Sequence, residues 1–349
     1  MAPRRLLALI LATAAALQPE RLFVGGLGYC GLRIAEIFRE KYGCAVAGCV
    51  RSAEKQEMLA ARYPWLETHV LDLDNSYSGL DTQGQRALAQ ATHVIETVAP
   101  IADFDEDPLL ALRADCLRGQ WVAYLSSTGV YGDHDGRWID EDAACLCTDA
   151  KSQARVQAEL KFAAHDAVIL RLGGIYGPGR SLLDAKRRAA PSASEKPVNR
   201  VYVDDIAGAL LALVDTRSET YNVVDDDPAP RGVVSAFVDE LVGPASTETK
   251  APKPSRGTGS KRCRNAKLRG VYDLVAPTYR EGLMRIRDAD GALAAAARRQ
   301  ARIKSAQQDL QAVALADQRA DVESGETYWM RDKYQELQKL AAEDPEPAA

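Results

Sequence analysis

A run of closely spaced glycines near the N-terminus constrains the fold of this chain more than any other feature. The run reads Val-Gly-Gly-Leu-Gly-Tyr-Cys-Gly over residues 24–31, and it satisfies both G-x-G-x-x-G and G-x-x-G-x-x-G. It follows a short apolar stretch, 21–24, and precedes a stretch with helical spacing of apolar residues, 32–41. Glycines between a strand and a helix allow a tight turn and let backbone N–H groups approach a pyrophosphate. We therefore expect a dinucleotide site formed by residues of this turn: Gly25, Gly26, Gly28, Tyr29, Cys30 and Gly31.

Short apolar stretches alternate with helical ones through the first half of the chain. Strands are predicted at 21–24, 45–50, 70–73, 93–98, 121–126 and 167–172, and helices at 32–41, 54–62, 107–118 and 151–165. Repeated β-α-β units with apolar strands form a parallel sheet that is covered by helices on both faces. The sequence therefore predicts an α/β fold with a Rossmann-like, doubly wound parallel sheet.

The second half of the chain has shorter elements and then changes composition. We expect the nucleotide-binding part to span about 21–172 and a small substrate lobe to span about 173–288. Within the lobe, strands are predicted at 200–203 and 220–223, and helices at 205–214 and 231–241. Residues 289–349 are rich in Ala, Gln, Arg and Glu, which predicts an appended helical arm with a disordered end. Apolar positions along this arm favour association with a second copy or with a protein partner.

The first 20 residues have the layout of a targeting signal. Arg4 and Arg5 precede an apolar run, 6–17, that ends in small residues. The run is short for crossing a bilayer, so no integral membrane span is predicted. A buried N-terminal helix is the alternative. If the segment is a leader, we expect delivery to an organelle such as a plastid, and otherwise a cytoplasmic protein.

Charge and cysteine content exclude several classes of protein. The chain has 44 basic and 49 acidic residues, a net charge of -5 that does not indicate a nucleic-acid partner. Its seven cysteines are scattered and odd in number, which does not suggest a disulfide framework. With four histidines and no dense Cys/His cluster, we expect no metal site.

The end of the second predicted strand bears on the choice of cofactor. Val50 lies 19 residues after Gly31, where an acidic residue would bind the adenosine ribose of NAD. The neighbouring Arg51 could instead pair with the 2′-phosphate of NADP, so NADP is favoured, with NAD as the alternative. The ends of the next two predicted strands complete the expected cofactor site with Asp72, Leu73 and Val98.

Several motifs in the same order resemble one enzyme family. Residues 126–132, Ser-Ser-Thr-Gly-Val-Tyr-Gly, are similar to the S-S-x-x-V-Y-G signature of extended short-chain dehydrogenase/reductases. Further segments similar to that family are Leu-Arg-Leu at 170–172, Tyr-Gly-Pro-Gly-Arg at 176–180, Val-Tyr-Val-Asp-Asp-Ile-Ala at 201–207 and Tyr-Asn-Val at 221–223. The resemblance spans about 22–288. It implies oxidoreductase or epimerase/dehydratase chemistry on a small carbonyl compound or a nucleotide-linked sugar, with Tyr176, Arg180 and Tyr202 in the substrate region.

The catalytic residues that this resemblance implies are only partly present. Members of the family use a Ser with the Tyr and Lys of Y-x-x-x-K, in which the Tyr transfers the proton. Ser127 matches the Ser, but Lys151 stands at the Tyr position and Arg155 at the Lys position, where it could still hold the nicotinamide ribose. A phenol from Tyr131 or Tyr176 could replace the missing Tyr. The alternative is a non-catalytic NADP-binding sensor or assembly factor that uses the helical arm.

Overall fold

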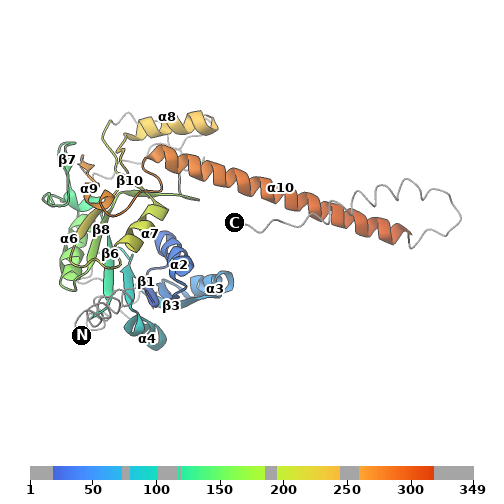
Figure 1. Cartoon of the computed structure of the whole chain (residues 1–349), viewed down its shortest axis with the longest axis horizontal. Coiled ribbons are helices and arrows are strands. Elements are labelled where there is room, and N and C mark those ends of the chain that lie inside the picture. The colour runs from blue at the N-terminus through green and yellow to red at the C-terminus, as the bar shows by residue number, and fades with distance from the viewer. Residues whose placement is uncertain are drawn as a thin grey trace, which may run out of the picture. The chain divides into compact units, whose positions relative to one another are not determined.

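The structure, a computed structural model, describes residues 19–72, 79–100, 117, 119–184, 195–243 and 259–317 (Figure 1). The chain divides into two compact units, one up to Leu283 and one from Met284, and each is described by itself. The predicted leader lies almost wholly outside the described residues, as do most of the helix predicted at 107–118 and the end of the arm after 317. The predicted limits of the leader, the lobe and the arm stay predictions.

An eight-stranded sheet forms the centre of the first unit. Its strands are β1 (Arg21–Gly25), β2 (Ala45–Val50), β3 (Leu66–Asp72), β4 (Gly79–Leu80), β5 (His93–Glu96), β6 (Trp121–Ser127), β8 (Val168–Leu172) and β11 (Thr220–Val223). They lie in the order β11-β8-β6-β5-β1-β2-β3-β4, and every neighbouring pair is parallel except β3 and β4. The strand order reverses at β1, as in doubly wound sheets. The predicted Rossmann-like α/β fold is confirmed.

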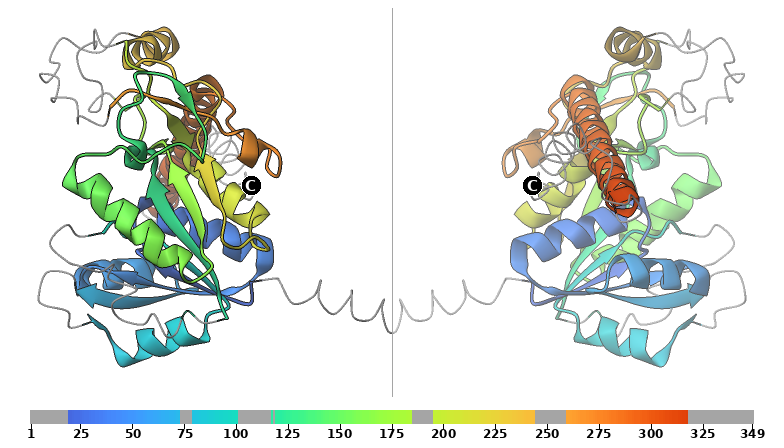
Figure 2. Two further views of the ribbon diagram at one scale, coloured as in Figure 1. Left: turned by 90° about the vertical axis from the view of Figure 1, so that its left-hand side faces the viewer. Right: turned by 90° about the vertical axis from the view of Figure 1, so that its right-hand side faces the viewer.

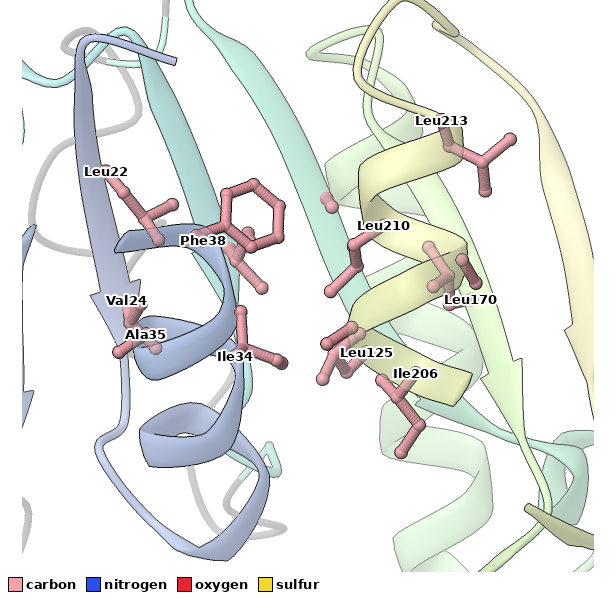
Figure 3. Close-up of a cluster of buried hydrophobic side chains, with 14 of the residues drawn as sticks. Leu22, Val24, Ile34, Ala35, Phe38, Leu125, Leu170, Ile206, Leu210 and Leu213 are labelled. Atoms are coloured by element: carbon pink, nitrogen blue, oxygen red, sulfur yellow. The ribbon is translucent and has the colours of Figure 1, made fainter. Parts of the chain in front are cut away.

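Helices cover both faces of this sheet because its strands are apolar on both sides. The helices are α2 (Tyr29–Tyr42), α3 (Ala53–Arg62) and α7 (Val203–Ala212) on one face, and α4 (Thr82–Gln90) and α6 (Ala150–Ala163) on the other (Figure 2). In β1, Leu22 and Val24 belong to the core under α2 and α7, whereas Phe23 belongs to the core under α4 and α6. Figure 3 shows the first of these cores, where Phe38 of α2 and Leu210 of α7 approach the strands.

The C-terminal lobe of the first unit is built from short elements. Its strands pair as β9 (Gly174–Tyr176) with β10 (Arg200–Tyr202), and as β7 (Trp138–Ile139) with β12 (Arg262–Cys263). The helices α8 (Arg231–Val242) and α9 (Ala266–Arg269) complete it. The strand β7 precedes α6 in the chain, so the lobe draws on residues from both halves of the sequence.

Two consecutive aspartates fix α7 between the sheet and the lobe. Asp204 accepts two hydrogen bonds from Arg33 of α2, at 2.6 and 2.9 Å, and thereby joins the two helices. Asp205 is buried, which raises its pKa, and it accepts hydrogen bonds from the Tyr272 hydroxyl and from the backbone N–H groups of Val275 and Ala276. These bonds attach the segment that leads into the last helix to the start of α7.

The last described element is α10 (Tyr279–Asp317), which begins in the first unit and continues as the described part of the second. The helical character expected for the residues after 288 is therefore observed as far as Asp317. None of the helices in the described ranges is both long enough and apolar enough to cross a membrane.

A buried histidine should make the stability of the sheet sensitive to acid. His93 packs against Trp121 with ring centroids 5.4 Å apart, and burial lowers its pKa from 6.5 to about 4. Since folding favours the neutral ring, its contribution to stability is complete above pH 6.5 and is lost as the pH falls toward 4. We expect His93→Phe to reduce the acid-induced loss of unfolding free energy over this range by up to about 3 kcal/mol, measured by urea unfolding.

The matched control is His165→Phe, because His165 is half-buried and lies outside the sheet. That variant should keep the acid sensitivity of the wild type. An unchanged acid response in His93→Phe would assign the sensitivity to other groups.

Candidate functional site

Three glycines of the turn between β1 and α2 are required by close packing. A Cβ at Gly25 would overlap the Glu96 carboxylate, and one at Gly31 would overlap the carbonyl oxygen of Gly26. Gly26 itself has a φ of +94°, a backbone conformation that residues other than glycine rarely adopt. The turn is therefore held in one tight conformation against the end of β5.

Gly28 differs from these three because it faces open space. Apart from residues adjacent in the chain, no described residue has an atom within 4 Å of the point where a Cβ on Gly28 would stand. Gly28 is also the N-cap of α2 and offers no side chain to the first N–H groups of the helix, whereas Ser52, Asp81 and Asp149 cap α3, α4 and α6. Uncapped N–H groups beside open space bind anions well. The turn thus fits the pyrophosphate of a dinucleotide.

The ends of β2 and β5 hold the turn in place. The Thr97 hydroxyl donates to the carbonyl oxygen of Gly26 at 2.7 Å, and the N–H of Gly26 donates to the Cys49 sulfur at 3.2 Å. Val98 follows Thr97, and its side chain would contact a Cβ on Gly26. The structure therefore places Val98 beside the turn, and its role in cofactor binding stays a prediction. Cys49 was missed, although its position just before Val50 in a strand that ends at the turn was a usable signal.

The other expected cofactor residues have different surroundings. Burial raises the pKa of Tyr29 to about 12 and that of Cys30 to about 11, so both are neutral at physiological pH. Arg51 is exposed at the end of β2 and has no hydrogen-bond or ion-pair partner among the described residues. The side chain of Asp72 and the whole of Leu73 lie outside the described part of the chain.

Ser127 ends β6 and faces the start of α6. Its Oγ accepts a hydrogen bond from the N–H of Gly129 at 3.1 Å, at the start of a short 3₁₀ helix, Thr128–Tyr131. The point where Gly129 would carry a Cβ lies 3.3 Å from the Ser127 Oγ and 3.2 Å from the Ser152 Oγ. Ser152 of α6 thus lies beside Gly129 and Ser127, and it was not among the predicted site residues.

The two residues of α6 at the family's Tyr and Lys positions are less buried than Ser152. Lys151 is exposed in the first turn of α6, and Arg155 is half-buried one turn later. Arg155 has no hydrogen-bond or ion-pair partner within the described ranges, so its guanidinium could still reach a ligand.

The structure corrects the expectation that Tyr131 or Tyr176 supplies a catalytic phenol. Tyr131 is fully buried, its hydroxyl donates to the Asn222 side-chain oxygen at 2.8 Å, and burial raises its pKa. Tyr176 is also buried, its hydroxyl lies 3.4 Å from the carbonyl oxygen of Thr278, and burial raises its pKa as well. As placed, neither hydroxyl is free to donate a proton to a substrate.

A buried ion pair lies behind this region and was also missed. Arg171 of β8 contacts the Glu159 carboxylate of α6 at 2.8 Å, and the Ser126 hydroxyl donates to the same carboxylate. The Arg171 guanidinium also lies 4.7 Å from the centre of the Tyr131 ring. A charged residue within the otherwise apolar strand Val-Ile-Leu-Arg-Leu was the signal, since such residues are rarely buried without a partner. The pair fixes α6 on the sheet.

The three expected substrate residues are divided between two places. Tyr176 and Tyr202 lie side by side in the lobe with ring centroids 5.7 Å apart. Arg180 is exposed, and its guanidinium carbon lies 5.3 Å from the centre of the Tyr29 ring, at the glycine turn. The structure thus brings Arg180 to the residues expected to bind the cofactor.

Comparison with known proteins agrees with this fold. No family model matches the chain. Protein YeeZ from Escherichia coli K12 is 25% identical over 238 residues, which cover 64% of this chain and 84% of YeeZ.

Two solved structures are also similar. A functionally unknown conserved protein from Silicibacter pomeroyi is 30% identical, with a TM-score of 0.64 over 78% of this chain and 99% of that chain. A protein from Methylobacillus flagellatus, provisionally named an NAD-dependent epimerase/dehydratase, is 27% identical. Its TM-score is 0.60, and the match covers 77% of this chain and 98% of that chain.

A parallel doubly wound sheet with a glycine turn at its strand reversal defines a Rossmann-type protein. Together with the motifs and the similar structures, it shows that this chain belongs to the extended short-chain dehydrogenase/reductase superfamily.

Proposed function

We propose that this protein binds a nicotinamide dinucleotide at the carboxyl ends of the strands, with the pyrophosphate at the first turn of α2. The observation that carries this proposal is the open space beside Gly28, next to helix N–H groups that no side chain caps. The name of the Methylobacillus flagellatus protein, an NAD-dependent epimerase/dehydratase, supports the same class of ligand.

The chemistry that fits this site is hydride transfer to or from a small carbonyl compound or a nucleotide-linked sugar. A bound nicotinamide would supply the hydride donor or acceptor. Among this chain's own residues, the Ser127 hydroxyl is placed at the end of β6 to orient a carbonyl oxygen, and Arg155 could contact the nicotinamide ribose.

A second candidate is a non-catalytic NADP-binding sensor or assembly factor. It is favoured by the absence of a free phenol at Ser127 in the part of the chain that the structure describes. Lys151, which stands at the family's Tyr position, is exposed and carries no phenol.

One experiment addresses both candidates and the choice of cofactor. Binding of NADPH and NADH is followed by fluorescence, and oxidation of the bound cofactor is followed with a panel of small aldehydes and keto-sugars. If the wild type turns over a substrate and the rate falls in Ser127→Ala, the result supports the enzymatic function. Tight binding without turnover of any substrate supports the sensor or scaffold. Failure to bind either cofactor would reject both.

Arg51 should determine a preference for NADP. Its exposed guanidinium has no partner among the described residues and would pair with the 2′-phosphate. We expect Arg51→Ala to weaken NADPH binding by roughly 10-fold or more, the loss of a charge-assisted hydrogen bond, and to leave NADH binding nearly unchanged. Equal losses for both cofactors in a calorimetric titration would remove the argument for NADP.

A further inference from the structure

A turn of the C-terminal lobe lies directly against the glycine turn. Gly177 and Arg180 close the lobe turn through two backbone hydrogen bonds, N–H of Arg180 to O of Gly177 at 2.9 Å and the reverse at 3.3 Å. The Tyr29 hydroxyl donates to the carbonyl oxygen of Pro178 at 3.0 Å. A Cβ on Gly177 would contact that same hydroxyl, so the approach is close. Tyr29 is the first residue of α2, so the lobe turn contacts the side chain of a residue whose backbone belongs to the proposed pyrophosphate site.

Arg180 brings a positive charge to this contact. Its guanidinium carbon lies 5.3 Å from the centre of the Tyr29 ring, which is within the range of a cation–π contact. Its charge also acts on the neighbouring Cys30, where it lowers a thiol pKa that burial raises. The guanidinium is therefore close to two consecutive residues whose backbone N–H groups open α2.

No carboxylate among the described residues balances the charge of Arg180. No described residue forms an ion pair or a side-chain hydrogen bond with its guanidinium, and the side chain is exposed. Arg33, one turn along α2, is neutralised instead by Asp204 at 2.6 Å and Glu36 at 3.2 Å. Of these two arginines, Arg180 is the one available to an anion.

We propose that Arg180 binds the pyrophosphate of the dinucleotide together with the first turn of α2, so that the lobe contributes to cofactor binding. This inference rests on the proposed function, and it moves Arg180 from the substrate region, where the sequence analysis placed it, to the cofactor. A diphosphate offers paired oxygens that match the planar fork of a guanidinium. The Tyr29 ring restricts the guanidinium in advance, which lowers the entropy cost of binding.

The test compares a ligand that carries the diphosphate, together with the ribose beyond it, with one that ends at the nucleoside. Adenosine and ADP-ribose are titrated by displacement of bound NADPH, with the wild type, Arg180→Gln and Arg180→Lys. The matched control is Lys41→Gln, which removes one charge from the far end of the same helix, where Lys41 is exposed.

We expect Arg180→Gln to weaken ADP-ribose and NADPH by roughly 10- to 100-fold and to leave adenosine unchanged. Arg180→Lys should recover part of the loss, because it restores the charge without the fork. Lys41→Gln should bind all three ligands as the wild type does. Melting temperatures of the variants check that the fold is retained.

Other outcomes would overturn the proposal. An equal loss for adenosine and ADP-ribose would show that Arg180 supports the fold of the site rather than the diphosphate. Unchanged ADP-ribose binding in Arg180→Gln would remove the residue from the cofactor site. A wild type that binds neither NADPH nor ADP-ribose would reject the proposed function, and this inference with it.

Discussion

Gly28→Ala should weaken dinucleotide binding at least 100-fold while the protein stays folded. The φ of Gly28 is −85°, which any residue can adopt, and the added methyl group would meet no described atom within 4 Å apart from those of residues adjacent in the chain. The methyl group would instead occupy the space that the pyrophosphate needs and separate it from the N–H groups of α2. Loss of two charge-assisted hydrogen bonds at about 1.5–3 kcal/mol each corresponds to at least a 100-fold loss of affinity. NADPH titration measures this loss, and circular dichroism confirms the fold.

Gly31→Ala serves as the contrasting variant. Its Cβ would overlap the carbonyl oxygen of Gly26, so this change should disturb the turn itself and lower the melting temperature together with binding. If Gly28→Ala bound NADPH as tightly as the wild type, the pyrophosphate could not lie at this turn, and the proposed function would lose its main support.

Arg171→Met should cost about 3–5 kcal/mol of unfolding free energy, because it leaves the buried Glu159 carboxylate without its cation. The remaining hydrogen bond from Ser126 does not compensate a buried charge. The double variant Arg171→Met with Glu159→Gln should recover a large part of the loss, since no unpaired charge is then buried. Urea unfolding at neutral pH measures all three proteins.

An exposed pair provides the control for this comparison. The Arg137 Nη2 and Asp135 Oδ2 atoms lie 3.9 Å apart, and both side chains are mostly exposed to solvent. Arg137→Met should therefore change stability by less than about 1 kcal/mol. A similar small effect for Arg171→Met would mean that the interior pair contributes no more than a surface pair does.

The sheet could be predicted because its strands carry their own signal. The stretches at 21–24, 45–50 and 220–223 consist mostly of apolar or β-branched residues, and each lies within a strand of the structure. The strand β4 and the helix α4 were not predicted. A strand of two residues has no periodicity, and α4, Thr-Gln-Gly-Gln-Arg-Ala-Leu-Ala-Gln, has few apolar residues to mark a buried face.

In the candidate site, too, one part could be predicted from the sequence and another part could not. The glycine turn could be predicted because its residues are consecutive and its geometry is local. The placement of Arg180 over Tyr29 depends on a contact between distant parts of the chain, and that of Glu159 beside Arg171 depends on how α6 packs on the sheet. The two phenols were misjudged for the same reason, because a sequence position at the end of a strand does not show what the hydroxyl of its side chain will meet.

The two border strands of the main sheet affect whether a strand of another molecule can pair with it. At one border β4 is only two residues long and runs antiparallel to β3. At the other, the backbone of β11 is already engaged: the N–H of Asn222 donates to Glu141, and Lys267 donates to the carbonyl oxygen of Thr220. Among the described residues, the two borders therefore offer a foreign strand little backbone to pair with, which disfavours strand-to-strand aggregation of the folded protein.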